Sequence, residues 1–246
     1  MSSQQENFIS HLVELRDRLL RGVIGFIIVF VALMAYPGAA FIFDLLAQPI
    51  QSALPEGTKM IATGVITPFM VPVKLTAMVA FVISLPILLY QAWAFVAPGL
   101  YQHEKKMALP IIFSSTVLFL IGIAFCHFIV FGKVFAFIND FAPQSITPAP
   151  DIEAYMSFVL TMFMAFGMTF EVPIVVVVLV YLGVVTVEKL VEIRGYVIVA
   201  AFVIAAIVTP PDVMSQLFLA IPICILYEVG ILFAKMIGKQ RQHIVE

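Results

Sequence analysis

The sequence predicts an all-α polytopic membrane protein with six transmembrane helices. Of its 246 residues, 63% are apolar and only 11% are charged, and the mean hydropathy is +1.11. Several runs of about 20 apolar residues are each long enough to cross a hydrocarbon core of roughly 30 Å as a helix. These runs are too long and too uniformly apolar for the alternating strands of a membrane barrel, so helices are the expected spanning elements.

The spans follow one another along residues 1–246, which we interpret as a single membrane domain. We place them at 22–40, 69–90, 107–132, 155–183, 196–209 and 213–233. The fifth run is shorter than a comfortable span, and only the tight TPPD turn at Thr209–Asp212, before the next apolar run, argues that it crosses. A short pair of helices should either thin the bilayer locally or fail to reach its far side.

Basic residues indicate the orientation of the chain in the membrane, since positive charge is retained in cytoplasmic connections. Ten of them fall on one side: Arg16, Arg18, Arg21, Lys105, Lys106, Lys189, Arg194, Lys235, Lys239 and Arg241. The other side has Lys59 and Lys133, with Lys74 inside the outer end of the second span. Both termini are therefore expected to face the cytoplasm.

Motifs for enzymes, metals and cofactors are missing from the sequence. There is no GxSxG elbow and no Walker A loop, and the pair His103–Glu104 is followed by Met107 where a zinc site needs its second histidine. Cys126 and Cys224 lie inside predicted spans and are interpreted as packing residues without a disulfide. The basic residues form no dense patch for nucleic acid. We expect no enzyme activity, no cofactor and no metal.

The segment 8–22 before the first span is amphipathic. Its apolar residues recur every three or four positions at Phe8, Leu12, Leu15 and Leu19. On the other side, Glu14 and Arg18 stand four residues apart, as do Asp17 and Arg21. One interpretation is a surface helix at the headgroup level, with weak ion pairs of roughly 0.2 to 0.5 kcal/mol each. The other is that its carboxylates belong to a binding site.

A second polar cluster, AFVAPGLYQHEKK at 94–106, connects the second and third spans. Pro98 fixes a turn, and Phe95 is an aromatic residue of the kind found at the membrane interface. Glu104 has a simple explanation, because a carboxylate near the start of a helix is favoured by about 0.3 to 1 kcal/mol. The sharper hypothesis is that Glu14 and Glu104 lie at the same depth and together bind a guanidinium, for which arginine is preferred over lysine.

Glu171 is a carboxylate inside the apolar fourth span, in the stretch FGMTFEVP. Pro173 removes the amide that would bond the carbonyl of Thr169, which predicts a kink at this depth. In an ion-coupled transporter Glu171 would be a proton relay, whereas its simplest structural role is that of a buried neutral carboxyl that pins two helices together. A purely structural membrane scaffold would not need carboxylates on two cytoplasmic connections. The halves of the chain show no internal symmetry and the spans hold few other ionisable groups, which argues against the transporter.

Four motifs together resemble the TatC family, the multispanning subunit of the twin-arginine protein translocase: HLVELRDRL, WAFVAPGLYQHEKK, SFVLTMFMAFGMTFEVP and TPPDVMSQLFLAIPICILYEVG. The resemblance implies six helices in a cupped arrangement, with a short fifth and sixth helix. It also implies a bacterial inner-membrane receptor for folded precursors with twin-arginine signal peptides. TatB and TatA, the single-span partners in a multimeric complex, would take part in export driven by the proton-motive force.

The same resemblance implies roles for residues on the cytoplasmic side. Glu14 and Glu104 match the carboxylates that contact the arginine pair of the signal peptide, and Phe95 lies in the same cytoplasmic loop as Glu104. Arg16, in ELRDR, matches a further position that is important in the family.

Further roles follow from the other motifs. Thr209 and Gln216 resemble the polar pair near which a partner's transmembrane helix docks, and Asp212 between them is placed to cap the sixth helix. Pro49, in the outer segment AQPI, matches another important position. The resemblance places Glu171 on the concave side, within reach of water and partners.

Overall fold

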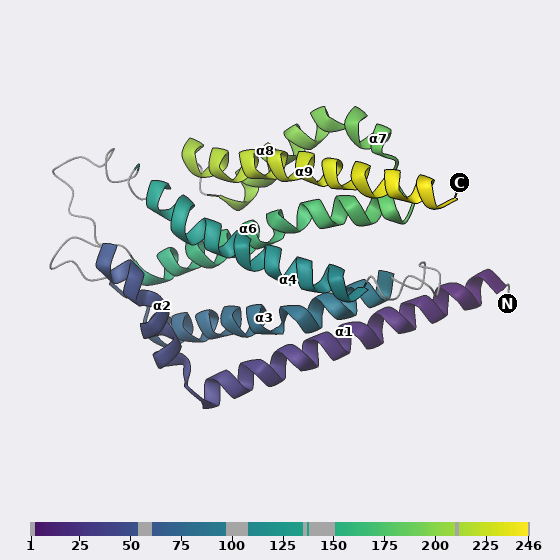
Figure 1. The fold of residues 1–246 in the computed structure, drawn as a ribbon. Coiled ribbons are helices and arrows are strands. Elements are labelled where there is room, and N and C mark those ends of the chain that lie inside the picture. Colours follow the sequence, from purple (N-terminus) through teal and green to yellow (C-terminus); the bar gives the residue numbers. More distant parts are fainter. Residues whose placement is uncertain are drawn as a thin grey trace. The chain divides into compact units, whose positions relative to one another are not determined.

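The computed structural model describes residues 3–53, 61–96, 108–134, 137, 151–209 and 212–245, and all the regular elements in these ranges are helices (Figure 1). The chain divides into two compact units, 1–116 with 148–157, and 117–147 with 158–246. In the described ranges, five helices are long and apolar enough to span a membrane: Leu12–Ala35, Thr67–Ala92, Leu109–Val134, Ile152–Tyr181 and Val213–Met236. The shorter apolar helix Arg194–Val208 accounts for the remaining predicted span. The all-helical prediction is confirmed.

Helix α1, Ser3–Ala35, is unbroken over 33 residues, or about 50 Å. The amphipathic segment 8–22 and the first span are therefore parts of one continuous helix. No proline interrupts the segment, and good helix formers such as Leu, Glu and Arg carry it through. The helix ends at Ala35, before Pro37 and short of the predicted end at residue 40, and α2 follows as Ala39–Ala53.

Helix α3, Thr67–Val96, runs antiparallel beside α1 (Figure 1). Two glycines of α1 allow the close approach: a Cβ on Gly22 would lie 3.2 Å from Leu88 Cδ2, and one on Gly25 would lie 3.3 Å from Ile87. Glu14 lies eight residues before Gly22, and Val96 lies eight residues after Leu88. Because the two helices are antiparallel, both steps run in the same direction and cover the same rise. The end of α3 therefore lies level with Glu14.

The first unit has a small core at the other end of α3. Val71 of α3 and Met156 of α6, Ile152–Tyr181, are buried there, and Phe43 of α2 packs against them. This core joins α2, which the sequence did not predict as a helix, to the starts of two spanning helices.

In the second unit, α4 (Ala108–Phe125) continues into a π-helical turn at Cys126–Val130 and contacts α6. The last part of α6 packs with α7 (Val187–Glu192) and α9 (Val213–Val245) around a common core. Its buried residues are Val176, Leu190, Tyr227, Ile231 and Ala234. Cys126 and Cys224 are both free, as predicted.

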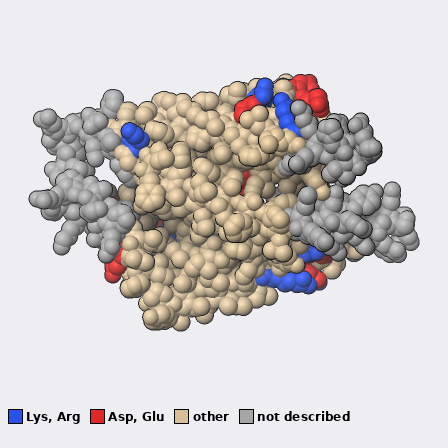
Figure 2. Space-filling model, viewed as in Figure 1, with Lys and Arg blue, Asp and Glu red and all other residues tan. Residues whose placement is uncertain are grey.

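The fifth predicted span falls on the 15-residue helix α8, Arg194–Val208, which is short, as predicted. Helix α9 differs from the expected short sixth helix, because it continues for 33 residues. Its apolar part, Val213–Met236, is followed by lysine, glutamine and arginine residues that extend a helix readily. The visible molecular surface is largely uncharged, and its few charged side chains form small groups (Figure 2).

Candidate functional site

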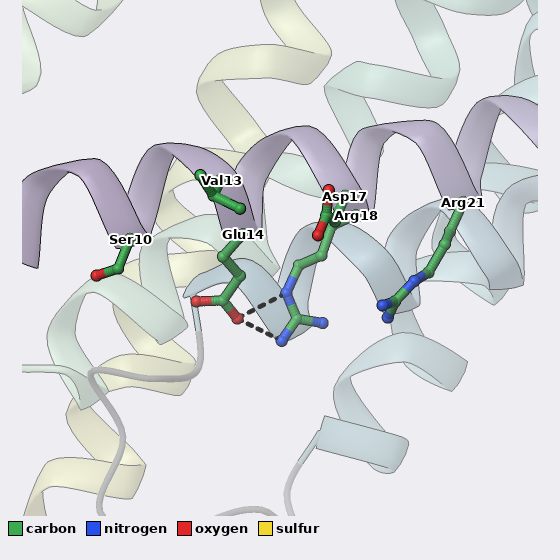
Figure 3. A pocket seen from close by; sticks show the side chains of 6 residues that line it. All are labelled: Ser10, Val13, Glu14, Asp17, Arg18 and Arg21. Atoms are coloured by element: carbon green, nitrogen blue, oxygen red, sulfur yellow. Dashed lines mark hydrogen bonds and ion pairs between the residues drawn. The ribbon is translucent and has the colours of Figure 1, made fainter.

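A shallow pocket lies on α1, and its lining side chains all belong to this helix (Figure 3). They are Ser10, Val13, Glu14, Asp17, Arg18 and Arg21. Their spacing of three and four residues puts them on one face of the helix. The pocket contains one of the two carboxylates that the sequence analysis assigns to guanidinium binding.

Glu14 holds a guanidinium from its own helix. Its Oε1 accepts hydrogen bonds from Arg18 Nε at 2.9 Å and from Arg18 Nη2 at 2.6 Å (Figure 3). The side chains are 34% and 21% exposed, so the contact is partly removed from water. Oε2 of Glu14 makes no hydrogen bond within the described part of the chain. The predicted pair of Glu14 and Arg18 is confirmed.

The second predicted pair, Asp17 with Arg21, does not form. Asp17 Oδ1 instead accepts hydrogen bonds from its neighbour Arg16, at 2.9 Å from Nε and 2.8 Å from Nη2. The long Arg16 side chain can fold back over the adjacent residue, and both side chains remain exposed. Arg21 lines the pocket and makes no ion pair with any described residue (Figure 3).

The structure brings part of the other predicted cluster to this level. Phe95 lies half-buried in the last turn of α3, whose end at Val96 is level with Glu14. Glu104 belongs to the segment 97–107, which lies outside the described residues. The approach of Glu104 to Glu14 thus stays a prediction.

The predicted docking residues Thr209 and Gln216 both bond within the chain. Thr209 is 6% exposed, and its hydroxyl donates to the carbonyl of Ala205 at 2.8 Å. Gln216 Nε2 donates to the carbonyl of Phe202 at 3.2 Å. Thr209 therefore closes the end of α8, while Gln216 ties α9 to α8.

Asp212 caps α9, as the sequence predicted. Its Oδ1 accepts a hydrogen bond from the backbone amide of Ser215 at 2.6 Å, and its carbonyl accepts from the amide of Gln216 at 3.3 Å. A helix start has amides without intrahelical partners, and a side-chain oxygen at this position satisfies one of them.

Glu171 is half-buried in α6, which continues as a helix through Pro173. Near this residue α6 meets α9 closely, because a Cβ on Gly230 would lie 3.0 Å from Pro173 Cα. The carboxylate is thus two residues from a backbone contact between helices. The predicted kink and the water access of Glu171 remain predictions. Pro49 lies within α2.

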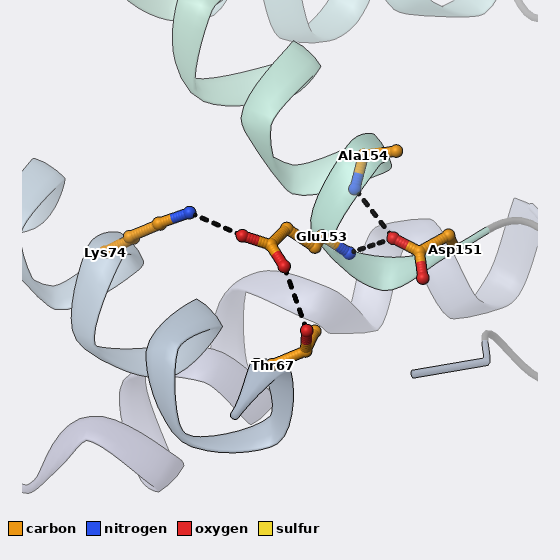
Figure 4. A network of polar contacts seen from close by, with 5 residues as sticks. All are labelled: Thr67, Lys74, Asp151, Glu153 and Ala154. Atoms are coloured by element: carbon orange, nitrogen blue, oxygen red, sulfur yellow. Dashed lines mark hydrogen bonds and ion pairs between the residues drawn. The ribbon is translucent and has the colours of Figure 1, made fainter. Parts of the chain in front are cut away.

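A polar network that the sequence did not predict joins α3 to α6 (Figure 4). Lys74 Nζ lies 2.8 Å from Glu153 Oε1, and the Thr67 hydroxyl donates to Glu153 Oε2 at 2.9 Å. Lys74 was recognised as a basic residue at the outer end of its span. Its partner could not be found, because no sequence pattern relates side chains of two separate helices.

Asp151 begins α6 in the same network. Its Oδ1 accepts from the amides of Glu153 and Ala154, each at 2.9 Å, and its Oδ2 accepts from the hydroxyl and the amide of Thr63 (Figure 4 shows the two helix amides). These hydrogen bonds, that of the Thr63 hydroxyl first, lower the pKa of Asp151 to about 2. An Asp directly before an apolar run is a helix-start signal that could have revealed the cap.

A further pair fixes α7 and α8 to α9 in the second unit. Arg194 Nη2 lies 2.6 Å from Glu228 Oε2, and the Tyr227 hydroxyl donates to the carbonyl of Leu190 at 2.8 Å. Neither contact was predicted from the sequence.

The fold defines a class of protein, namely a multispanning helical membrane protein, and its N-terminal helix carries the ion pair of Glu14 with Arg18. Among the described residues there is no cluster of metal-ligating side chains. Residues 10–222 match the sequence model of the Sec-independent protein translocase protein TatC. The chain therefore belongs to the TatC family, and it is a protein translocase protein.

Relatives and solved structures agree with this assignment. TatC of Haemophilus influenzae is 52% identical over 232 residues, which cover 94% of this chain and 90% of that protein. TatC of Escherichia coli is 46% identical over 234 residues, with coverages of 95% and 90%. The crystal structure of the twin arginine translocase receptor TatC is 40% identical, with a TM-score of 0.81 over 92% of this chain and 98% of that one. The ion-coupled transporter alternative finds no support.

Proposed function

We propose that this chain is the receptor and core subunit of a twin-arginine translocation system. It binds twin-arginine signal peptides of folded precursors at the cytoplasmic face of a bacterial inner membrane, with both termini in the cytoplasm. With the single-span proteins TatB and TatA it mediates export driven by the proton-motive force, and it catalyses no chemical reaction. The binding residues are Glu14, Glu104, Phe95 and Arg16.

The observation that carries this proposal is the contact of Glu14 with a guanidinium. Two nitrogens of Arg18 lie within 2.9 Å of one carboxylate oxygen in a partly desolvated pocket. A carboxylate in this setting makes charge-assisted hydrogen bonds with the fork of donors that arginine offers. Lysine offers a point charge without the fork, so a paired-lysine signal would bind more weakly.

The packing of α1 on α3 supports a role for Glu104 in the same site. Since α3 ends at Val96, level with Glu14, the connection that carries Glu104 starts at the depth of the pocket. Two carboxylates at one depth suit a ligand with two adjacent guanidinium groups. Phe95, in the last turn of α3, would lie against the bound peptide.

We assign partner docking to the region of Thr209 and Gln216. At 15 residues, α8 is about 22 Å long, shorter than the roughly 30 Å hydrocarbon core. Its exposed large apolar residues are Tyr196, Ile198, Val199, Phe202, Val203, Ile204 and Ile207. Such an apolar surface suits the apolar side of a single-span helix, and Gln216 would act by fixing α8 to α9.

Glu171 and Pro49 have supporting roles in the proposal. The half-buried carboxylate of Glu171 would admit water or a partner's polar group to the membrane-embedded part of α6. Pro49 and the cap residue Asp212 would maintain the local structure of the segments that hold them.

Export of a reporter tests the proposed function. Cells that lack the protein and then regain it should export a reporter with a paired-arginine signal and retain one with paired lysines. Glu104→Ala should abolish crosslinking of the arginine precursor, and Glu14→Ala should have the same effect in a milder form. In both variants the protein should stay inserted in the membrane. Glu188→Ala is the matched control, because Glu188 is an exposed carboxylate on α7 outside the pocket. Normal crosslinking in the Glu14/Glu104 double variant would refute the assignment.

A further inference from the structure

Arg18 occupies the carboxylate that the proposed function assigns to the signal peptide. We infer that Arg18 is a built-in competitor, which must leave Glu14 before an arginine of the signal can bind. This inference rests on the proposed function of Glu14 and adds a residue that sets the strength of binding.

The geometry of the contact permits an exchange. Arg18 places both of its donors on Oε1 of Glu14, and Oε2 has no hydrogen bond within the described residues. An incoming guanidinium can bond both oxygens with two parallel hydrogen bonds, which is the stronger arrangement. Because Glu14 and Arg18 are on the same helix, four residues apart, their pair can open without movement of any other element.

Arg18 differs from the other two arginines of this segment. Arg16 is held by Asp17, and Arg21 forms no ion pair with the described residues. Each of the three contributes one positive charge near the pocket, but only Arg18 contacts Glu14. The variant Arg21→Gln is therefore a control, because it removes the same charge and leaves the ion pair of Arg18 with Glu14 in place.

The expected size of the effect follows from the weakness of such pairs. An ion pair of this kind is only slightly favourable, so Glu14 is released for part of the time. The apparent affinity of a ligand is its intrinsic affinity multiplied by the fraction of competent receptor, which gives a reduction of roughly two- to sixfold. This factor is the same for every ligand that needs Glu14, so Arg18 weakens binding without changing the preference for arginine over lysine.

Peptide binding to the full-length chain in lipid nanodiscs tests this role. The probes are two labelled synthetic signal peptides that differ only in an arginine pair or a lysine pair. Arg18→Gln should bind the arginine peptide roughly two- to sixfold more tightly than the unmodified chain. Arg21→Gln should give a smaller gain in affinity. This gain should disappear as the salt concentration is raised, because Arg21 acts only through its long-range electrostatic potential, which salt screens. The lysine peptide should gain the same factor from Arg18→Gln.

Three further variants complete the test. Arg18→Lys keeps the charge with a weaker contact and should give an intermediate affinity, and it guards against a folding defect in Arg18→Gln. In a Glu14→Gln background, Arg18→Gln should give no more than the small, salt-sensitive gain of Arg21→Gln. An Arg18→Gln gain no larger than that of Arg21→Gln, or one confined to the lysine peptide, would overturn the inference. If Glu14→Gln itself leaves binding of the arginine peptide unchanged, the proposed function of Glu14 fails instead.

Discussion

The cap of α9 allows a prediction that separates structural from functional use of Asp212. Its Oδ1 accepts the Ser215 amide at 2.6 Å, so Asp212→Ala leaves that amide without its partner. Loss of such a cap costs about 0.5 to 2 kcal/mol, and asparagine is nearly as good a cap as aspartate. Asp212→Asn loses only the interaction of a negative charge with the helix dipole, about 0.3 to 1 kcal/mol.

Thermal unfolding of the purified protein in detergent measures the difference. For a chain of this length, about 1 kcal/mol corresponds to a change in Tm of about 2–4 °C. We therefore expect Asp212→Ala to lower the Tm by about 1–8 °C and Asp212→Asn to lower it less. Export should follow stability in both variants. Equal loss of Tm in the two would refute the capping role, and an export defect in a fully stable Asp212→Asn would show that the carboxylate has another use.

Three further predictions concern the helix contact at Gly122, the network at Asp151 and the carboxylate Glu171. Gly122→Ala places a Cβ 2.5 Å from the carbonyl oxygen of Phe166 and should destabilise the protein by about 1–3 kcal/mol, measured as a lower Tm, whereas Gly195→Ala, in open space, should not. The pKa of Asp151 is lowered from 3.8 to about 2, so the stabilisation by its hydrogen bonds is complete above about pH 4 and is lost as the pH falls toward 2. Asp151→Asn should therefore flatten the curve of stability against pH between these two values. Glu171→Gln should export a reporter normally and Glu171→Leu should not, and a defect in Glu171→Gln would mean that the carboxylate itself, and not only its polarity, is required.

The spanning helices could be predicted from the sequence because a bilayer needs long apolar runs, and these dominate the chain. Their ends were harder to predict, because a helix continues as long as its residues permit, whatever their polarity. The segment before Gly22 and the polar end of α9 both extend helices beyond the apolar stretch. The helix α2 was not predicted, because its 15 residues are too few to span a membrane.

The candidate site was predictable where local spacing decides the contact. Glu14 and Arg18 are four residues apart on a helix and pair as expected, and Asp212 caps the helix that it precedes. The choice of Asp17 between Arg16 and Arg21 depends on side-chain conformations, which spacing does not determine. Contacts between helices, such as Lys74 with Glu153, require the packed structure.

In the proposed function, the pocket at Glu14 receives the arginine pair of a signal peptide. Val13 lines this pocket and is 42% exposed, whereas Val31 is an exposed valine near the far end of α1. A photoreactive residue at position 13 should crosslink a paired-arginine precursor and fail to crosslink its paired-lysine counterpart. At position 31, any crosslinking should be the same for both precursors. Equal crosslinking of the two precursors from position 13, or none from that position, would contradict the account.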